Sequence, residues 1–293
     1  MRVFVTGATG FIGSATVQDL IAAGHSVLGL ARSDAGADAL AKLGVEAHRG
    51  ELTDHASLIA GAKACDGVIH TAFIHDFSQF LANIEIDRLA VTAMVGALEG
   101  TGKPLMIASG TMMVAHARPA TEHDNPLSLE APRAASEAIV RGAKGVRGGV
   151  VRLSPTVHGA GDHGFIPTLI AMARSNGFAA YVGNGQNRWP AVHRLDAARL
   201  FRLALEKAPP GAVLHAAAEE GIPMLSIAET IGAGLGLPVK SLSEEEAPAY
   251  INFLARFVGT DNPTSCAITR QTLGWDPTGP DLLTDLKEHG YFA

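Results

Sequence analysis

Three glycines near the N-terminus, Gly7, Gly10 and Gly13, have the spacing needed to bring a phosphate group close to the backbone. Gly7 permits a tight turn, and Gly10 lets the chain approach a ligand because it lacks a Cβ atom. Gly13 lets a following helix pack closely on the preceding strand. The apolar run Val3–Thr6 and the helical spacing of apolar residues from Phe11 onward supply the strand and helix that this motif requires. Free N–H groups at the start of that helix attract phosphates, so we predict a dinucleotide site.

The end of the second predicted strand, residues 26–31, indicates which dinucleotide is bound. An NAD site usually has an acidic residue there, which accepts a hydrogen bond from the ribose 2′-hydroxyl. This chain has Arg32 and Ser33 instead, a planar guanidinium and a hydroxyl that suit the 2′-phosphate of NADP. We therefore predict NADP. The alternative is that Arg32 is a solvated surface residue and that Asp34 holds the ribose of NAD.

Several later segments occur in a recognisable order after the opening Thr-Gly-Ala-Thr-Gly-Phe-Ile-Gly. They are residues 68–73, 151–159, 192–198 and 273–277. In this order they resemble the extended short-chain dehydrogenase/reductase family, which includes epimerases and dehydratases, and the resemblance covers nearly the whole chain. It implies a cofactor site made of Gly7, Thr9, Gly10, Phe11, Ile12, Gly13, Arg32, Ser33, Leu52, Thr71, Ala72, Phe73, Ser109, Ser154 and Thr156.

The predicted catalytic segment departs from the family pattern. Family enzymes use a Ser or Thr after the fifth strand, then a Tyr with a Lys four residues later. Thr111 falls on the Ser/Thr position, but Arg133 and Glu137 stand where the register places Tyr and Lys. Arginine is effectively never deprotonated and cannot act as a general acid at neutral pH. The chain therefore resembles atypical members that lack the standard proton relay.

Two interpretations of Arg133 and Glu137 follow from their spacing. At i and i+4 on a helix they can form an ion pair that is only structural. Alternatively, Arg133 binds a substrate carboxylate or polarises a carbonyl, while Glu137 holds the nicotinamide ribose.

Other side chains are candidates to supply the proton or to bind the substrate. His75 follows the fourth strand and precedes Asp76, and a histidine beside a carboxylate is a common acid/base pair near neutral pH. The alternative is that His75 caps or packs its loop. The family resemblance places His158 and His163, which flank a glycine-rich loop, and the polar stretch 183–190 beside the substrate. From these we take His158, His163, Arg188 and Trp189 as substrate-site candidates. Tyr181, one of three tyrosines in the chain, is the candidate for a displaced phenol.

Bulk properties exclude several classes of function. The chain has 293 residues and a net charge of −6 with no long run of one sign, which argues against a nucleic-acid or anionic-membrane partner. It has two cysteines, and its histidines are scattered without metal-ligand spacing, so we expect neither a disulfide scaffold nor a metal site. The first strand starts at residue 2, and no apolar stretch reaches the roughly 18 residues of a membrane helix. We expect a cytoplasmic protein with a small-molecule substrate. Members of the family that it resembles can form homodimers through helices that correspond to 77–98 and 132–143.

Alternating strand and helix patterns predict the architecture. Further strands are expected at 45–49, 67–71, 104–109, 149–153 and 213–216, with helices at 38–43, 58–62, 77–98, 132–143, 194–205, 227–235, 244–256 and 265–273. This alternation is typical of an α/β fold with a doubly wound parallel sheet. We expect a dinucleotide-binding domain at 1–154 plus about 193–217, and a smaller, interleaved α/β substrate lobe at about 155–192 and 218–293.

These features together predict an NADP-dependent oxidoreductase that transfers a hydride to or from a small carbonyl or alcohol, with a non-standard catalytic centre. The alternatives are an epimerase or dehydratase that uses its cofactor transiently, or a non-catalytic NADP-binding sensor.

Overall fold

The computed structural model describes residues 1–115, 118–128, 133–251 and 255–293. In this part of the chain, seven parallel strands form a central sheet in the order β10-β6-β5-β4-β1-β2-β3. The bounds are β1 Arg2–Thr6, β2 Ser26–Ala31, β3 Glu46–Arg49, β4 Gly67–His70, β5 Pro104–Gly110, β6 Arg147–Leu153 and β10 Ala212–Ala216. The strand order reverses between β1 and β4, so ligands are expected at the carboxyl ends of these two strands.

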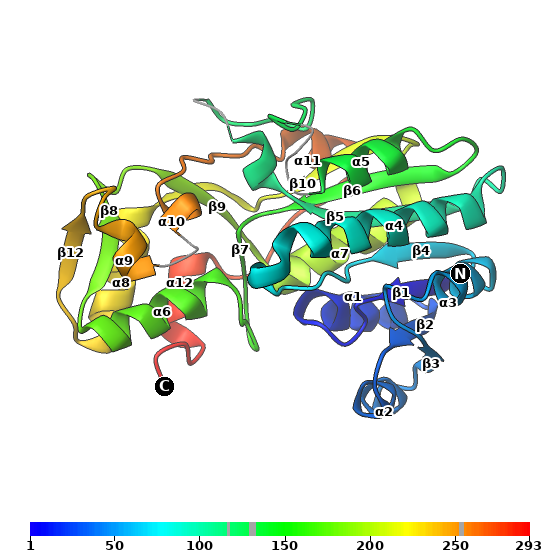
Figure 1. Ribbon diagram of the computed structural model, residues 1–293, viewed down its shortest axis with the longest axis horizontal. Coiled ribbons are helices and arrows are strands. Elements are labelled where there is room, and N and C mark those ends of the chain that lie inside the picture. The colour runs from blue at the N-terminus through cyan, green and yellow to red at the C-terminus, as the bar shows by residue number, and fades with distance from the viewer. Residues whose placement is uncertain (116–117, 129–132, 252–254) are drawn as a thin grey trace.

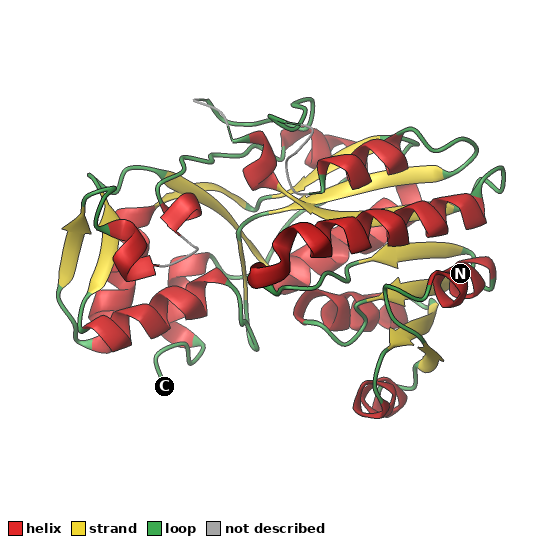
Figure 2. Ribbon diagram, in the orientation of Figure 1, coloured by secondary structure: helices red, strands yellow, loops and turns green. Residues whose placement is uncertain are grey.

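Helices cover both faces of this sheet (Figures 1 and 2). One face carries α3 His55–Lys63, α4 Phe80–Leu98 and α5 Ala134–Arg141, and the other carries α1 Phe11–Ala22 and α7 Arg194–Lys207. Helix α2 Asp34–Lys42 joins β2 to β3, and short 3-10 helices span Phe77–Gln79 (η1) and Thr111–Val114 (η2). The predicted doubly wound parallel α/β fold is therefore confirmed.

A second group of elements lies at the other end of the molecule and has an apolar core of its own (Figure 1). It contains a three-stranded sheet, β11-β9-β7, and a two-stranded sheet, β12-β8. Its strands are β7 Thr156–His158, β8 Ala179–Val182, β9 Arg188–His193, β11 Glu219–Pro223 and β12 Val239–Leu242. Its helices are α6 Phe165–Asn176, α8 Met224–Leu235, α9 Ala247–Ile251, α10 Ala255–Val258 and α12 Leu282–Glu288, while α11 Ala267–Leu273 lies against β10.

Several predicted boundaries differ from the structure for local reasons. Helix α2 begins at Asp34 rather than residue 38 because Ser33 caps it, accepting a hydrogen bond from the Gly36 nitrogen. Within the helix predicted at 244–256, α9 begins at Ala247 rather than residue 244 and α10 spans Ala255–Val258, while residues 252–254 lie outside the described part of the chain. Helix α5 starts at Ala134, and Pro132, where the sequence predicted its start, lies outside the described residues.

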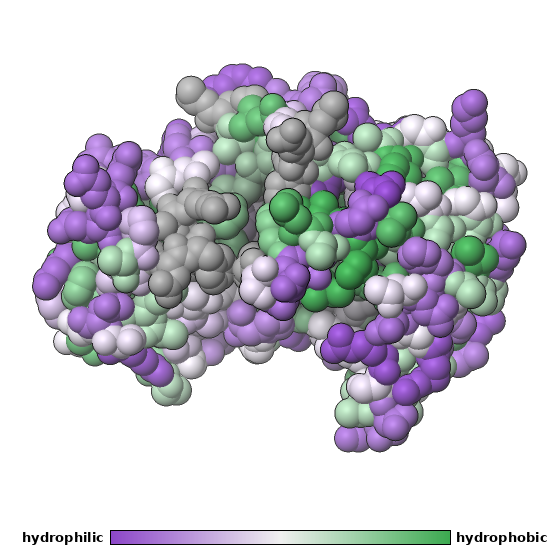
Figure 3. Space-filling model, viewed as in Figure 1, coloured by the Kyte–Doolittle hydropathy of each residue, from purple (hydrophilic) through white to green (hydrophobic). Residues whose placement is uncertain are grey.

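Apolar side chains gather over α4 on the face shown in Figure 3. Leu81 and Leu89, both on α4, are 80% and 36% exposed. The expected homodimer through this helix stays a prediction. None of the described helices combines the length and the apolar character needed to cross a membrane.

Candidate functional site

The glycine turn between β1 and α1 is closed too tightly for side chains. Gly7 has a φ of +69°, and a Cβ atom on it would lie 2.7 Å from the Ala72 nitrogen. A Cβ atom on Gly13 would lie 1.9 Å from the Gly7 carbonyl oxygen. Gly10 is the N-cap of α1 and has no side chain to accept from the first-turn N–H groups, which therefore remain for a ligand. The turn and helix end thus form a cradle of the kind that holds a dinucleotide pyrophosphate.

Several other predicted cofactor residues use their hydroxyls to hold backbone carbonyls at the strand ends. The Thr71 hydroxyl donates to the Thr6 carbonyl at 2.8 Å and ties the end of β4 to the end of β1. The Ser154 and Thr156 hydroxyls donate to the Ala216 and Pro190 carbonyls at 2.7 and 2.6 Å. These hydroxyl hydrogens are committed to backbone oxygens. The structure places the other predicted side chains as follows: Thr9 is exposed, Phe11, Ile12 and Phe73 are half-buried, and Leu52 packs on the core.

Two arginines lie at the carboxyl ends of β2 and β3. Arg32 is exposed directly after β2, and Arg49 closes β3, where the sheet register pairs it with Ala31. The Arg49 guanidinium lies 3.0 Å from the Asp34 carboxylate. Asp34 is the acid that would hold the ribose of NAD in the alternative interpretation. The Ser33 hydroxyl oxygen caps α2, which leaves its hydrogen free to donate. Sequence reasoning missed Arg49; its position as the last residue of the third strand was the available signal.

The hydroxyls predicted after the fifth strand are both buried. Thr111 is fully buried at the start of η2, and its hydroxyl accepts a hydrogen bond from the Asn262 amide at 2.9 Å. Ser109, on β5, is 5% exposed, and its hydroxyl has no hydrogen-bond partner among the described residues. Of the two, Ser109 therefore carries the unsatisfied donor at the end of β5.

Arg133 is bound by a carboxylate that the sequence did not predict. Its Nη2 atom donates to Asp87 on α4 at 2.6 Å. The same carboxylate accepts from the Ser136 hydroxyl at 2.7 Å and from His70 Nε2 at 3.2 Å. His70 Nδ1 lies 2.7 Å from the Thr6 hydroxyl. A continuous polar chain thus runs from Thr6 at the end of β1 to Arg133, the N-cap residue of α5.

The electrostatics of this chain keep Asp87 ionised. Burial opposes the charge on Asp87, but the Arg133 guanidinium and His70 hold its pKa well below the ordinary range. Arg133 also lies over the Phe73 ring, with 4.8 Å from its guanidinium carbon to the ring centre. Its φ is +65°, and among the described residues it is the only non-glycine with a positive φ. A left-handed conformation costs such a residue about 1–2 kcal/mol, so the surrounding contacts must hold it.

The interpretation in which Arg133 and Glu137 form an ion pair is wrong. Glu137 is 1% exposed and accepts from Arg152 on β6 through both oxygens, at 3.0 and 2.7 Å. Arg152 is itself fully buried and donates to the Asp124 carbonyl. The interpretation in which Glu137 holds a ribose also fails, because this carboxylate is enclosed in the core between α5 and β6. The two side chains take partners on different elements.

His75 lies in the loop after β4, near the end of Arg133. Its ring meets Phe73 edge-on at 5.3 Å. Crowding by neighbouring atoms, and then the charges of Arg133 and His163, lower the pKa of His75 below its usual 6.5. The neighbouring Asp76 carboxylate accepts from the backbone and hydroxyl of Ser78 at 2.9 and 2.6 Å, and so caps η1.

The two histidines that flank the loop 159–164 have different surroundings. His163 is exposed, and its ring lies edge-on to Phe11 of the glycine turn at 5.7 Å. His158 is fully buried at the end of β7, and its Nδ1 donates to Asp285 at 2.7 Å. His158 is therefore not a lining residue, whereas His163 lies beside Phe11, and its predicted role at the substrate stays a prediction.

Three of the predicted substrate residues make their contacts within the second group of elements. Tyr181 is on β8, paired with β12 at the end of the molecule far from the glycine turn (Figure 1), so the displaced-phenol interpretation is wrong. Trp189 is fully buried against Phe165, with 5.6 Å between ring centres, and cannot stack on a substrate ring. Arg188 binds the Asp261 carboxylate through two nitrogens at 3.0 and 2.8 Å. The β8–β9 segment is thus a structural part of the second group of elements.

Comparison with known proteins identifies the family. The sequence model of the NAD dependent epimerase/dehydratase family matches residues 3–217, which is more than half of the chain. The chain belongs to the NAD dependent epimerase/dehydratase family.

Relatives in this family are similar over most of the chain. An uncharacterized protein of Schizosaccharomyces pombe is 48% identical over 100% of both chains. The 2-alkyl-3-oxoalkanoate reductase of Stenotrophomonas maltophilia is 28% identical over 81% of this chain and 77% of its own. A dTDP-glucose 4,6-dehydratase of Streptomyces venezuelae, solved with NAD and TYD bound, superposes with a TM-score of 0.78 at 19% identity, covering 100% of this chain and 96% of that chain. That last likeness concerns the fold.

As a member of the NAD dependent epimerase/dehydratase family, the chain has residues that fit a bound dinucleotide. The observation that supports this fit is the cradle in which any Cβ on Gly7 or Gly13 would collide with backbone. In the part of the chain that the structure describes, no group of three or more His, Cys, Asp or Glu side chains is arranged to hold a metal ion. Asp87, Arg49 and Arg152 are the site neighbours that sequence reasoning missed.

Proposed function

We propose that this protein is an NADP-dependent oxidoreductase that interconverts a small carbonyl compound and its alcohol. The observation that carries the proposal is the arrangement around β1 and β4, where the glycine cradle, Arg133 and His75 all lie near the carboxyl ends of the strands. When bound, the nicotinamide supplies reversible hydride transfer, and the protein supplies binding, orientation and a proton.

The preference for the 2′-phosphate rests on the two arginines after β2 and β3. Arg32 is exposed, and Arg49 pairs with Asp34 through its Nη2 atom. Guanidinium groups present planar forks of donors that match phosphate oxygens. Asp34, the acid that would favour a free ribose hydroxyl, is already paired with one of them.

The role proposed for Arg133 is to bind a substrate oxygen. Asp87 fixes one end of the guanidinium, Phe73 supports its face, and its Nε atom is buried with no hydrogen-bond partner among the described residues. A permanently charged donor held in this way stabilises the negative charge that develops on a carbonyl oxygen during reduction. The same group suits the carboxylate of an oxo-acid, and the similarity to a 2-alkyl-3-oxoalkanoate reductase makes such oxo-acids the first compounds to test.

We assign the proton to His75, with Ser109 and Thr111 as hydroxyl donors near the substrate oxygen. A lowered pKa makes His75 mostly neutral at pH 7, so it is a proton acceptor for alcohol oxidation and donates when the pH is lower. Removing such a group is expected to slow turnover by about two to four powers of ten.

The direct test is calorimetric titration of the cofactor-free protein with NADPH and NADH, followed by a screen of 3-oxo-acids with the tighter nucleotide. Tighter binding of NADPH by tenfold, about 1.4 kcal/mol, supports the assignment. Equal or tighter binding of NADH contradicts the role of Arg32 and Arg49. Absence of binding to both nucleotides contradicts the whole proposal.

A second candidate function is a nucleotide-binding sensor without turnover. It is favoured by the enclosure of Glu137 by Arg152 and by the burial of Thr111 beneath Asn262. Binding of NADPH without oxidation of the nucleotide across the carbonyl screen would decide for the sensor. Any substrate-dependent oxidation that Arg133→Ala abolishes would decide for the enzyme.

A further inference from the structure

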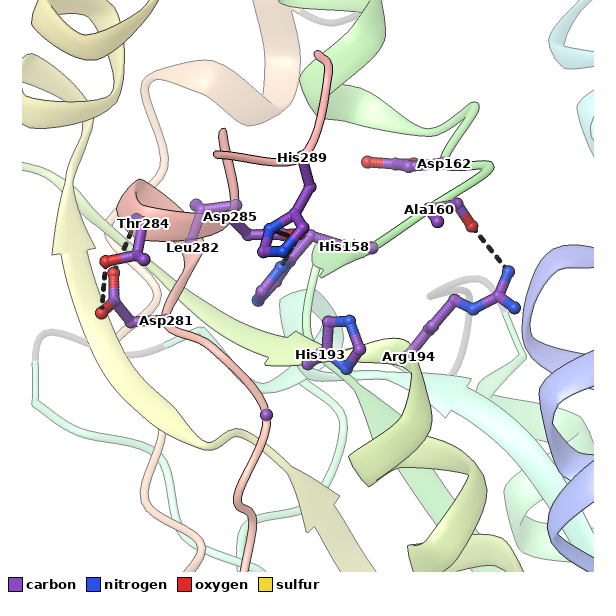
Figure 4. Close-up of polar contacts among 12 residues, drawn as sticks. His158, Ala160, Asp162, His193, Arg194, Asp281, Leu282, Thr284, Asp285 and His289 are labelled. Carbon is purple, nitrogen blue, oxygen red and sulfur yellow. Dashed lines mark hydrogen bonds and ion pairs between the residues drawn. The ribbon is translucent and has the colours of Figure 1, made fainter. Parts of the chain in front are cut away.

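The loop 159–164, which follows β7 of the second group of elements, lies against the glycine turn. Its His163 ring is edge-on to Phe11 at 5.7 Å. Arg194, the first residue of α7, holds the same loop, because its Nη1 donates to the Ala160 carbonyl at 2.7 Å (Figure 4). The Arg194 guanidinium also lies over Phe11, 5.3 Å from the ring centre. Phe11 is the first residue of α1, so the His163 ring of the loop and the Arg194 cation of α7 both lie at the helix end where phosphates bind.

The last residues of the chain fasten this loop from its other side. We call residues 289–293 the C-terminal strap. Its Tyr291 hydroxyl accepts from the Gly159 nitrogen at 2.9 Å and lies 3.0 Å from the Asp162 carboxylate, to which it donates. The other oxygen of Asp162 accepts from the Gly164 nitrogen at 2.7 Å. One phenol therefore connects the first residue of the loop to the carboxylate that shapes its far end.

The strap is itself anchored on two helices. Arg174 on α6 donates to the carbonyls of Phe292 and Ala293 at 2.9 and 3.2 Å. The Phe292 ring fills the space over Gly234 on α8, where an added Cβ atom would lie 2.3 Å from the ring. The strap therefore has a fixed position before any ligand arrives.

Below the strap, a buried carboxylate fixes the base of the loop. Asp285 on α12 accepts from His158 at 2.7 Å and from His289 at 2.8 Å, and Figure 4 shows both rings directed at it. His158 immediately precedes the loop, and His289 begins the strap. The loop and the strap thus share one anchor, so a displacement of either is passed to the other.

We propose that the C-terminal strap is a positioning element for the cofactor, and that Tyr291 sets dinucleotide affinity by holding the loop 159–164 against Phe11. The proposal rests on the proposed function for the identity of the ligand. Ordering a loop before binding removes an entropic cost that binding would otherwise carry. The strap residues need not touch the dinucleotide for this effect, because they act through His163, Arg194 and Phe11.

The test compares Tyr291→Phe with a matched control, Tyr250→Phe. The control variant also removes a tyrosine hydroxyl, which donates to the Phe178 carbonyl. Tyr250 lies on α9, away from the loop. We expect Tyr291→Phe to weaken NADPH binding about three- to tenfold, because the hydroxyl's hydrogen bonds to Gly159 and Asp162 no longer hold the loop. We expect the KM for NADPH to rise in proportion while kcat stays within about twofold. Equal dissociation constants for the two variants would overturn the proposal.

A second variant displaces the strap without removing any polar atom. The added Cβ atom of Gly234→Ala pushes the Phe292 ring away from α8. Apart from this contact, replacing a helical glycine by alanine stabilises the helix by about 1 kcal/mol. Weaker NADPH binding with an unchanged or higher melting temperature is the expected result. Unchanged NADPH binding in this variant, together with a displaced strap, would contradict the coupling.

Hydrogen exchange separates failure of this inference from failure of the proposed function. NADPH is expected to protect the amides of residues 7–13 and also those of 159–164 in the wild-type protein, and Tyr291→Phe is expected to speed exchange at Gly159 without ligand. Protection of 7–13 alone overturns the strap proposal and leaves the dinucleotide site intact. Protection of neither segment overturns both.

Discussion

The Arg133 guanidinium is bound to the Asp87 carboxylate at 2.6 Å, although Glu137 stands at the favourable i+4 spacing on the same helix. Arg133 has a left-handed backbone at the N-cap of α5, which turns its side chain toward α4 rather than along its own helix. Glu137 takes Arg152 on β6 instead. The two ion pairs therefore fix α5 on opposite sides, and Arg133 alone is left beside Phe73 and the proposed substrate.

Replacing Asp87 tests what holds Arg133 in place. Asp87→Asn leaves a largely buried guanidinium without its counter-charge, which we expect to destabilise the protein by about 3 kcal/mol in denaturant unfolding. The pKa of Asp87 is lowered on folding. Its contribution to the free energy of unfolding is therefore fully present above the unfolded pKa of about 3.9 and is lost progressively as the pH falls below that value. The stability of Asp87→Asn should therefore change less between pH 5 and pH 3 than that of the wild type. Parallel curves for the two proteins would argue against this pairing.

Adding one methyl group at Gly13 tests the cradle. The new Cβ atom of Gly13→Ala meets the Gly7 carbonyl at 1.9 Å, so the turn must open and dinucleotide binding should fall below detection by calorimetry. Gly96→Ala is the matched control, since Gly96 is also within a helix but a Cβ there has nothing within 4 Å. The control should keep its affinity and gain roughly 0.5–1 kcal/mol of stability. Normal NADPH binding by Gly13→Ala would refute the placement of the site.

Arg49→Ala tests the choice between NADP and NAD. We expect NADPH binding to weaken about tenfold or more, because a charge-assisted contact to phosphate is lost, while NADH binding stays the same. Arg88→Ala is a suitable control, because Arg88 pairs with Glu85 on the surface of α4. The measurement is titration of each variant with both nucleotides. An equal loss for both would show that Arg49 does not read the 2′-phosphate.

The pH dependence of turnover tests His75. Since the pKa of His75 lies below 6.5, carbonyl reduction should rise as the pH falls through that pKa, and alcohol oxidation should rise as the pH increases above it. His75→Asn should remove this dependence and slow turnover by about a hundredfold. If His75→Asn keeps the pH profile of the wild type, the proton comes from another group. Ser109 and Thr111 are then the next residues to replace.

The first half of the fold could be predicted because its signals are local. The second strand was predicted at its observed bounds, Ser26–Ala31, since apolar strands between polar helices leave little ambiguity. The second group of elements escaped prediction in large part. Strands such as β7 Thr156–His158 are too short to show a period, and α6 Phe165–Asn176 follows a glycine-rich loop that hides its start.

The sequence alone determined the glycine cradle, the alternation that builds the parallel sheet, and the arginine after β2, because each depends on neighbours within a few residues. Only the tertiary structure decided which charges meet. Asp87 reaches Arg133 because α4 packs on α5, and Arg152 reaches Glu137 because β6 lies beneath α5. Tyr291 reaches Gly159 because α12 docks beside β7 and β9. Such contacts join residues far apart along the chain, and no local spacing specifies which distant partner a buried polar group will find.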